Sequence, residues 1–377
     1  MITNFRLYFF TLFCSLTNIV YAEYNFPQKM IISVPVTDLR FQPKANTAQL
    51  PAGPNENPLQ ITQLLLGEHI MAHEEFIDEN NISWLRINSL QQEFFYEPLE
   101  WHGFPGWIQA HHAVSVESYP TSNLAVKKYV ADVYDEKKTR ICSLSLGTRL
   151  CGQQCDQDMW EIILPTGAKA YINNSDVYFF DQTIHESVNE LRKSIIQTAH
   201  AFVGNWYSWG GRSAQHEEFS ISSVDCSALV NLSFMAHGLQ LPRMSHEQFL
   251  RSIRIESCSD LQPGDLIFFS TITKNPMRMD HVMMFVGNDT LIEATHAANH
   301  TTRVVSFSQR MGQSCYTIKN GDIVYDDDIA FYVYFGTFFE NETLLQSLRN
   351  DALKNEYCPI YMNKRNMHED LAYCRCH

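Results

Sequence analysis

The sequence predicts a multidomain fold in which two small β-barrels precede an α+β domain. Short apolar runs separated by turn residues fill residues 28–118, and a weaker pattern of the same kind fills residues 122–180. Residues 183–338 contain two stretches with helical spacing, at 186–199 and after Asp225, and a strand-like run after His281. A chain of 377 residues is also too long for one hydrophobic core, which favours several domains.

Both predicted barrels consist of short strand-like stretches. The first stretch, Ile31–Arg40, reads as one strand, and a polar loop follows it through Pro58. The remaining stretches are 63–68, 83–87 and 103–108 in the first barrel, and 131–134, 146–147, 159–162 and 168–172 in the second.

A helix is predicted over residues 186–199, at the start of the third domain. Its apolar positions 188, 191, 195, 196 and 199 share one helical face, and Gly204 follows as a stop. The domain boundary therefore falls near residues 181–185. The C-terminal extension, residues 339–377, holds three cysteines and gives no functional signal.

Residues 1–22 have the features of a secretory signal peptide. Arg6 provides the positive charge, residues 7–20 are apolar, and Val20-Tyr21-Ala22 is a small-residue cleavage site. The apolar run is shorter than the ~20 residues that span a bilayer. We therefore expect a secreted or periplasmic protein with no stable membrane insertion.

Charge and composition exclude several classes of partner. The formal net charge of −14 argues against binding to nucleic acid or to anionic lipid. The sequence contains neither a P-loop nor a dinucleotide-binding glycine pattern. We expect no cofactor, and a monomer is the simplest expectation for the oligomeric state.

The cysteine count is consistent with export. Apart from Cys14 in the leader and Cys226, eight cysteines remain and can pair fully, in 105 possible ways. A structural zinc site is the alternative, but no paired C-x₂-C knuckles occur, so we expect no metal. The eight are Cys142, Cys151, Cys155, Cys258, Cys315, Cys358, Cys374 and Cys376.

Cys226 and His281 are the main candidates for chemistry. Asp225 is a good helix N-cap, so the Cys226 sulfur is expected in the first turn of a helix that ends before Gly238. Unpaired N–H groups there favour a thiolate. His281 begins a strand-like run and has the chemistry of a general base. A buried structural cysteine and a structural histidine are the alternatives.

Five sequence blocks resemble, in order, those of the NlpC/p60 cell-wall cysteine peptidases. The resemblance implies a papain-like α+β cysteine peptidase domain, with Cys226 as nucleophile and His281 as base. The leading region similarly resembles bacterial SH3-like domains, so the two barrels are expected to be SH3-like. The blocks are YSWGGRS at 207–213, DCS at 225–227, LPRMSHEQ at 241–248, LQPGDLIFF at 261–269 and DHV at 280–282.

The residue that orients the base departs from the family pattern. In the family it is commonly a histidine twelve positions after the first, and that position here is Glu293. A carboxylate can accept the same N–H bond, and it favours the imidazolium more strongly. His296 is the alternative, and we expect Glu293→Ala to cost much more rate than His296→Ala.

The resemblance also implies a substrate. Related enzymes cleave γ-D-glutamyl bonds in peptidoglycan stem peptides and recognise the free amine of an N-terminal L-alanine. The positions implied for that recognition are Asp225, Ser227 and Trp209, with Tyr207, Arg243, Ser245 and Gln248 as further candidates. A helix cap, for Asp225, and core packing, for the aromatic residues, are the structural alternatives.

The leading barrel of such peptidases often supplies a tyrosine to the pocket. Here the closing segment has Phe104, with Tyr96 upstream, so this contact is in doubt. We expect hydrolysis of the D-γ-glutamyl to diamino-acid bond in peptidoglycan-derived peptides. The alternatives are a thiol amidase or acyltransferase on the same core, and a non-catalytic wall-binding protein.

Overall fold

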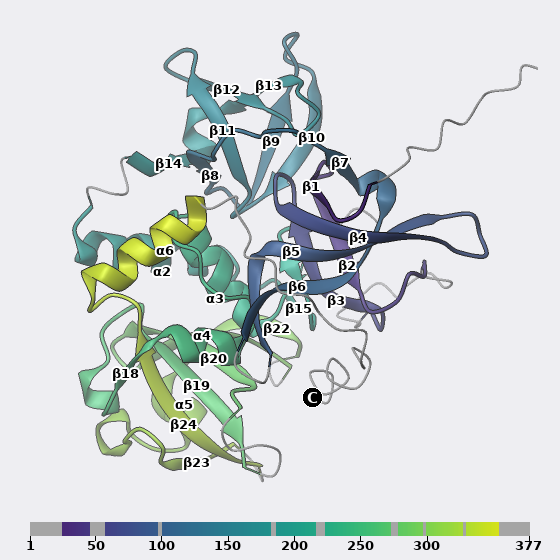
Figure 1. Cartoon of the computed structure of the whole chain (residues 1–377). Helices are drawn as coiled ribbons and strands as arrows, with labels where there is room; N and C mark the ends of the chain where they lie inside the picture. Colours follow the sequence, from purple (N-terminus) through teal and green to yellow (C-terminus); the bar gives the residue numbers. More distant parts are fainter. Residues whose placement is uncertain are drawn as a thin grey trace, which may run out of the picture.

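The computed structural model describes residues 25–45, 57–96, 100–181, 186–215, 223–272, 278–296, 299–326 and 329–353. These residues form three β-sheets, and the long helices gather on the third (Figure 1). The leader predicted over residues 1–22 lies outside the described residues. Among the described helices, none is long and apolar enough to cross a membrane.

The first sheet has seven strands in the order β3-β2-β6-β5-β4-β1-β7, and all its pairings are antiparallel. Leu39, Ile87 and Phe104 lie in its core. The paired strands β5 and β6 form a long hairpin that reaches α4 of the third domain (Figure 1). The strands are β1 (Gln28–Ile32), β2 (Val36–Arg40), β3 (Gln60–Leu65), β4 (His69–Ile77), β5 (Ser83–Tyr96), β6 (Glu100–Gln109) and β7 (Ala113–Ser115).

The single strand predicted over Ile31–Arg40 is wrong, because the chain breaks it at Ser33-Val34-Pro35. Pro35 has no N–H to donate to a ladder, and it restricts the residue before it. Strand β1 pairs with β4 and β7, whereas β2 pairs with β3 and β6. Strand β4 was not predicted from the sequence, since polar and charged residues interrupt its apolar alternation.

The second sheet repeats this size, with seven antiparallel strands in the order β10-β9-β13-β12-β11-β8-β14. Leu144, Trp160 and Ile172 are among its core residues. Its strands are β8 (Leu124–Val126), β9 (Val130–Tyr134), β10 (Arg140–Ser145), β11 (Arg149–Gln154), β12 (Met159–Ile163), β13 (Lys169–Asn173) and β14 (Val177–Phe179). The N-terminal region is therefore mostly β, while the SH3-like assignment of each sheet stays a prediction.

The third sheet runs β16-β17-β15-β22-β21-β20-β19-β24-β18, with β23 paired to β24. Alternate residues of β19 enter two cores: Leu266 and Phe268 face α2 and α3, whereas Ile267 and Phe269 face α5. The strands are β15 (Trp206–Tyr207), β16 (Arg212–Ser213), β17 (Ser223–Val224), β18 (Ile253–Ile255), β19 (Leu266–Thr271), β20 (His281–Gly287), β21 (Thr290–Thr295), β22 (Thr301–Ser306), β23 (Ile323–Asp326) and β24 (Ile329–Thr337).

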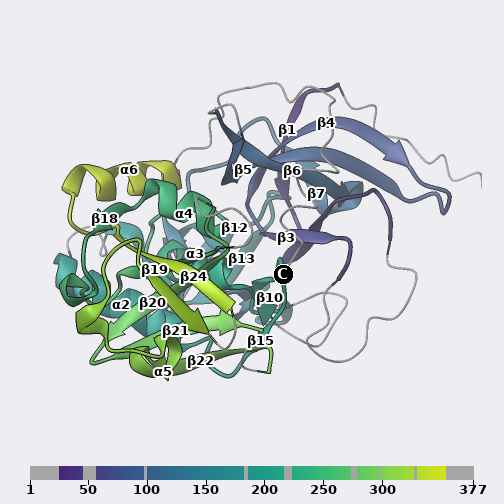
Figure 2. The ribbon, with the colours of Figure 1, turned by 90° about the horizontal axis from the view of Figure 1, so that it is seen from below.

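The helices of this domain are α2 (Val188–His200), α3 (Cys226–Met235), α4 (Ser245–Arg251), α5 (Phe307–Met311) and α6 (Glu342–Leu353). The predicted helix at 186–199 is confirmed as α2, and its N-cap Ser187 accepts a hydrogen bond from the Glu190 N–H. Figure 2 shows the first sheet, in purple to blue, to one side of this domain.

The start of the C-terminal extension is part of the core. Leu345 and Leu348 of α6 are buried beside Leu191 of α2 and Phe338, and the Gln240 N–H donates to the Leu348 carbonyl at 3.0 Å. Residues 354–377, with three of the cysteines, lie outside the described residues.

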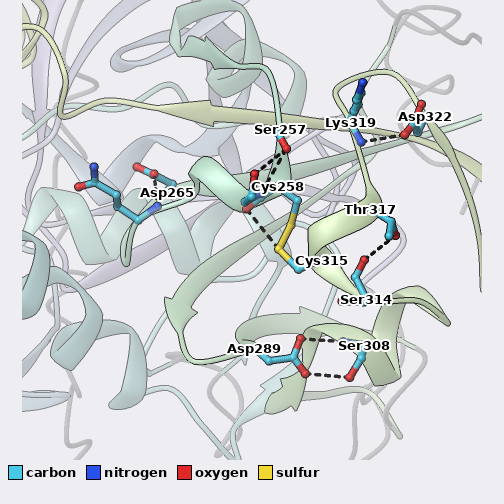
Figure 3. Close-up of a disulfide and its surroundings, with 12 residues drawn as sticks. Ser257, Cys258, Asp265, Asp289, Ser308, Ser314, Cys315, Thr317, Lys319 and Asp322 are labelled. Carbon is cyan, nitrogen blue, oxygen red and sulfur yellow. Dashed lines mark hydrogen bonds between the residues drawn. A yellow bond between two sulfur atoms is a disulfide. The ribbon is translucent and has the colours of Figure 1, made fainter.

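Among the described residues, the disulfide Cys258–Cys315 joins two 3₁₀ turns at the edge of the α5 core (Figure 3). Among the described cysteines that were expected to pair, Cys142, Cys151 and Cys155 carry free thiols. Full pairing of all eight cysteines therefore stays a prediction that depends on the C-terminal segment.

Candidate active site

Cys226 is the first residue of α3, as predicted. The Asp225 carboxylate caps this helix, because its Oδ1 accepts the Ala228 N–H at 2.8 Å. The whole helix is buried, and the Cys226 side chain is free of any disulfide and only 7% exposed. Cys226 therefore lies in the first turn of the helix, where the backbone N–H groups have no intrahelical partner.

His281 lies at the start of β20 and hydrogen-bonds Cys226. Burial alone would lower the pKa of His281, but its hydrogen bonds to Cys226 and Glu293 raise that pKa to about 9. A raised imidazole pKa beside a thiol favours the imidazolium–thiolate pair. The arrangement can therefore generate a nucleophilic sulfur and a proton donor at one place.

Glu293, rather than His296, hydrogen-bonds the imidazole of His281. Its Oε2 lies 2.9 Å from His281 Nε2, and the Glu293 side chain is fully buried on β21. Burial opposes ionisation of this carboxyl, yet its hydrogen bond with His281 and two arginines lower its pKa to about 2. His296 instead bonds His300, with 3.0 Å between their Nδ1 atoms.

The two arginines at Glu293 were not predicted from the sequence. Arg303 Nε and Nη2 donate to Glu293 Oε1 at 2.9 and 2.7 Å, and Arg310 Nε donates to Oε2 at 3.2 Å. Burial of a carboxylate signals that it needs a charged partner, but it does not identify Arg303 or Arg310.

Asp225 and Ser227 flank Cys226, but both are engaged with a third predicted residue, Arg243. The fully buried guanidinium of Arg243 donates to both Asp225 oxygens at 2.9 and 2.7 Å, and to Ser227 Oγ at 2.9 Å. Asp225 also accepts the Gly210 N–H at 3.0 Å and the Ser227 hydroxyl at 3.1 Å. Its lone pairs are therefore occupied within the protein.

Three further candidates, Tyr207, Trp209 and Ser245, contact other residues of the protein. Tyr207 is buried with its ring 4.3 Å from that of His296, and Trp209 stacks on Phe41 of the first sheet. Ser245 donates to the carbonyl of Met279, two residues before His281, at 3.1 Å. These contacts hold the site together and give Tyr207 and Trp209 packing roles.

Gln248, a further candidate, hydrogen-bonds the backbone near the start of α3. Its Nε2 donates to the carbonyls of Ser227 and Pro242 at 2.9 and 3.0 Å. Phe104 is fully buried in the core of the first sheet, 4.9 Å from Phe94, so its side chain is not available to a substrate. The side chain of Tyr96 lies outside the described residues.

Strand β3 of the first sheet contacts two arginines of the peptidase side, Arg243 and Arg212, and sequence reasoning did not identify these contacts. Thr62 Oγ1 accepts from Arg243 Nε at 2.7 Å, and the Gln63 side chain accepts the Arg212 N–H at 2.8 Å. Gly210 lies so close that an added Cβ would be 2.7 Å from the Ile61 carbonyl oxygen. The peptidase-side loop and the first sheet are thus packed without a gap.

In this site a cysteine at a helix start is hydrogen-bonded to an imidazole, and a buried carboxylate hydrogen-bonds the same imidazole. This arrangement defines the class of enzymes that use an activated thiol. Residues 204–321 match the NlpC/P60 family model. The chain therefore contains an NlpC/P60 domain and is a cysteine peptidase.

Relatives match beyond this domain. A Bacillus cereus protein named gamma-D-glutamyl-L-lysine dipeptidyl-peptidase is 26% identical over 249 residues, which cover 64% of this chain and 69% of the relative. A Bacillus subtilis protein of the same name is 25% identical over 248 residues, covering 63% and 73%. The crystal structure of an NlpC/P60 family protein from Bacillus cereus shares the fold, with a TM-score of 0.57, 23% identity and coverage of 74% and 94%.

Proposed function

We propose that this protein is an exported cysteine peptidase that hydrolyses the D-γ-glutamyl to diamino-acid bond of peptidoglycan stem peptides. Cys226 attacks the carbonyl, His281 takes up and returns the proton, and Glu293 orients the imidazole. The observation that carries the proposal is the hydrogen-bonded chain from Cys226 through His281 to Glu293.

The extent of the likeness supports the choice of bond. The two relatives named gamma-D-glutamyl-L-lysine dipeptidyl-peptidase align over about two thirds of this chain, more than the 204–321 domain alone. The contacts of β3 with Arg243 and Arg212 connect the first sheet to Asp225, the cap of the cysteine helix, through Arg243. A peptidase whose leading region shapes the site is suited to one short, defined peptide.

Selection for a free N-terminal L-Ala is a further part of the proposal. The Asp225 lone pairs are occupied, but Ser227 Oγ accepts one hydrogen bond, from Arg243, and its second lone pair can accept from an ammonium group. Because Asp225 is already paired with Arg243, an ammonium there would join an existing charge pair. We therefore expect N-acetylation of the peptide to lower kcat/KM by about tenfold, the value of one charged hydrogen bond.

The decisive experiment incubates the purified full chain with L-Ala-γ-D-Glu-L-Lys and with the meso-diaminopimelate analogue, followed by mass spectrometry. Release of the dipeptide L-Ala-D-Glu supports the proposal. The α-linked isomer of the same peptide controls for linkage, and Cys226→Ala controls for contaminating enzymes. Transfer of the acyl group to an added amine would point to an acyltransferase, and no product from either peptide would favour a wall-binding role.

Export is proposed on the signal-like residues 1–22 and is supported by the disulfide Cys258–Cys315, since disulfides persist in oxidising compartments. Fractionation of cells that produce the full chain, or the chain without residues 2–22, tests it. Retention of the full chain in the cytoplasm would contradict export and leave the chemistry untouched.

A further inference from the structure

We propose that Arg303 and Arg310 are positioning residues that set the proton balance of the Cys226–His281 pair by acting through Glu293. The inference rests on the proposed catalytic roles of these three residues and goes beyond them. It assigns a function in the reaction to two arginines that hydrogen-bond the carboxylate of Glu293.

The two arginines reach one carboxylate from two different elements. Arg303 lies directly opposite Glu293 in the register of β21 and β22, and it grips Oε1 with two nitrogens. Arg310 comes from α5 and donates to Oε2, the same oxygen that bonds His281 Nε2. The Glu293 side chain is fully buried, so these contacts fix both of its oxygens.

Arg310 is itself held in place. Its guanidinium lies 5.1 Å from the centre of the Phe269 ring, and Phe269 is the cross-strand partner of His281 in β19 and β20. The Arg310 side chain is only 5% exposed, whereas that of Arg303 is 31% exposed. Arg310 is therefore buried in the core. Arg303 is partly exposed, so its replacement should remove little packing.

A buried carboxylate that hydrogen-bonds a catalytic imidazole can impair proton transfer in two ways. Without compensating charge it takes up a proton, because burial disfavours its ionised form, or it holds the imidazolium so strongly that the proton is not returned. Two guanidiniums prevent both outcomes. They keep Glu293 ionised, in line with its lowered pKa, and they offset its field at His281.

The charged and titratable groups that face Glu293 come from four elements. His281 on β20, Arg303 on β22 and Arg310 on α5 contact the carboxylate directly. Cys226 on α3 is linked to it through its hydrogen bond with His281. Removal of one arginine takes away a positive charge near both the thiolate and the imidazolium. The thiolate is then less favoured and the imidazolium more favoured, so the pH range of the ion pair moves upward.

The test measures how fast Cys226 is alkylated by iodoacetamide between pH 4 and pH 10 in the full-length protein. Mass spectrometry of the Cys226 peptide separates its signal from the free thiols Cys142, Cys151 and Cys155. For Arg303→Gln we expect both limbs of the pH curve to move upward by about half a unit or more. Arg303→Lys, which keeps the charge, is expected to restore the wild-type limbs.

Unmoved limbs in Arg303→Gln, with only a lower melting temperature, would overturn the proposal and leave the arginine a purely structural ion pair. Equal shifts in Arg303→Gln and Arg303→Lys would overturn it as well, because charge would then not be the cause. Arg310→Gln is measured in the same way if this variant folds. If it does not fold, the Arg303 variants alone decide the proposal. Since alkylation needs no peptide substrate, the result stands even where the proposed bond is not cleaved.

Discussion

Arg243 and Asp225, the residue before Cys226, form a buried ion pair, with Arg243 Nη2 2.7 Å from Asp225 Oδ2. The same guanidinium reaches Thr62 of β3, so the pair ties the first sheet to the cap of the cysteine helix. A buried pair of this kind is costly to break, because removal of one partner leaves the other charge unpaired. The placement of the nucleophile therefore depends on residues from two domains.

We expect Arg243→Met to destabilise the protein by about 3 kcal/mol or more and to lower kcat/KM even for the folded fraction. The physical reason is that Asp225 keeps its helix-cap bond but loses its charge partner. Urea unfolding and peptide hydrolysis measure the two effects. The matched control is Arg251→Met, which removes a partly exposed ion pair with Glu93 in the same domain contact and should cost about 1 kcal/mol or less.

Glu293→Ala is expected to lower kcat/KM by at least about a hundredfold, because His281 then loses the group that fixes its orientation and tautomer. His296→Ala removes a ring that packs on Tyr207 and bonds His300, so its cost should stay within about tenfold. Steady-state kinetics on the same peptide compare the two variants. A larger loss in His296→Ala would assign the orienting role to that histidine.

The raised pKa of His281 predicts a defined alkaline limit. The imidazolium persists at neutral pH and is lost as the pH rises through about 9, so activity should fall on that limb. The free energy of unfolding depends on pH in the same direction. The stabilisation by His281 is fully present below its unfolded pKa of ~6.5 and disappears as the pH rises through about 9. Urea unfolding of the wild type and His281→Gln between pH 6 and pH 10 checks this, because the two curves should converge at alkaline pH.

The central pair was predictable from the sequence because its signals are local. Asp225 and Gly238 delimit the cysteine helix, and the apolar run after His281 gives its strand. Glu293 was reached through the family resemblance, which implies an orienting residue twelve positions after His281, and in the structure it lies on the strand that pairs with that of His281. In each case the informative residues are close in sequence to the side chain that they position.

What surrounds the pair was not predictable, because it depends on contacts between distant elements. Thr62 is 181 residues from Arg243, and the Arg310 side chain reaches Glu293 from α5, which packs against β22 and β23. Helix α6 lies in an extension that gave no signal, yet Leu345 and Leu348 close the core. Burial of a charge creates the need for a partner, but the sequence does not say which element supplies it.

The disulfide Cys258–Cys315 is expected to stabilise the fold without acting on the chemistry. It closes a chain segment with a sequence separation of 57, and a loop of that length corresponds to about 4 kcal/mol in the chain-entropy account. The double variant Cys258→Ser with Cys315→Ser should therefore unfold at lower urea concentration, while kcat/KM per folded molecule stays within about twofold of wild type. Cys142→Ser, at a cysteine that is free in the second sheet, is the matched control and should change neither quantity. A loss of peptide hydrolysis in the folded double variant would show that the α5 side of the domain, which carries Arg310, is positioned by this bond.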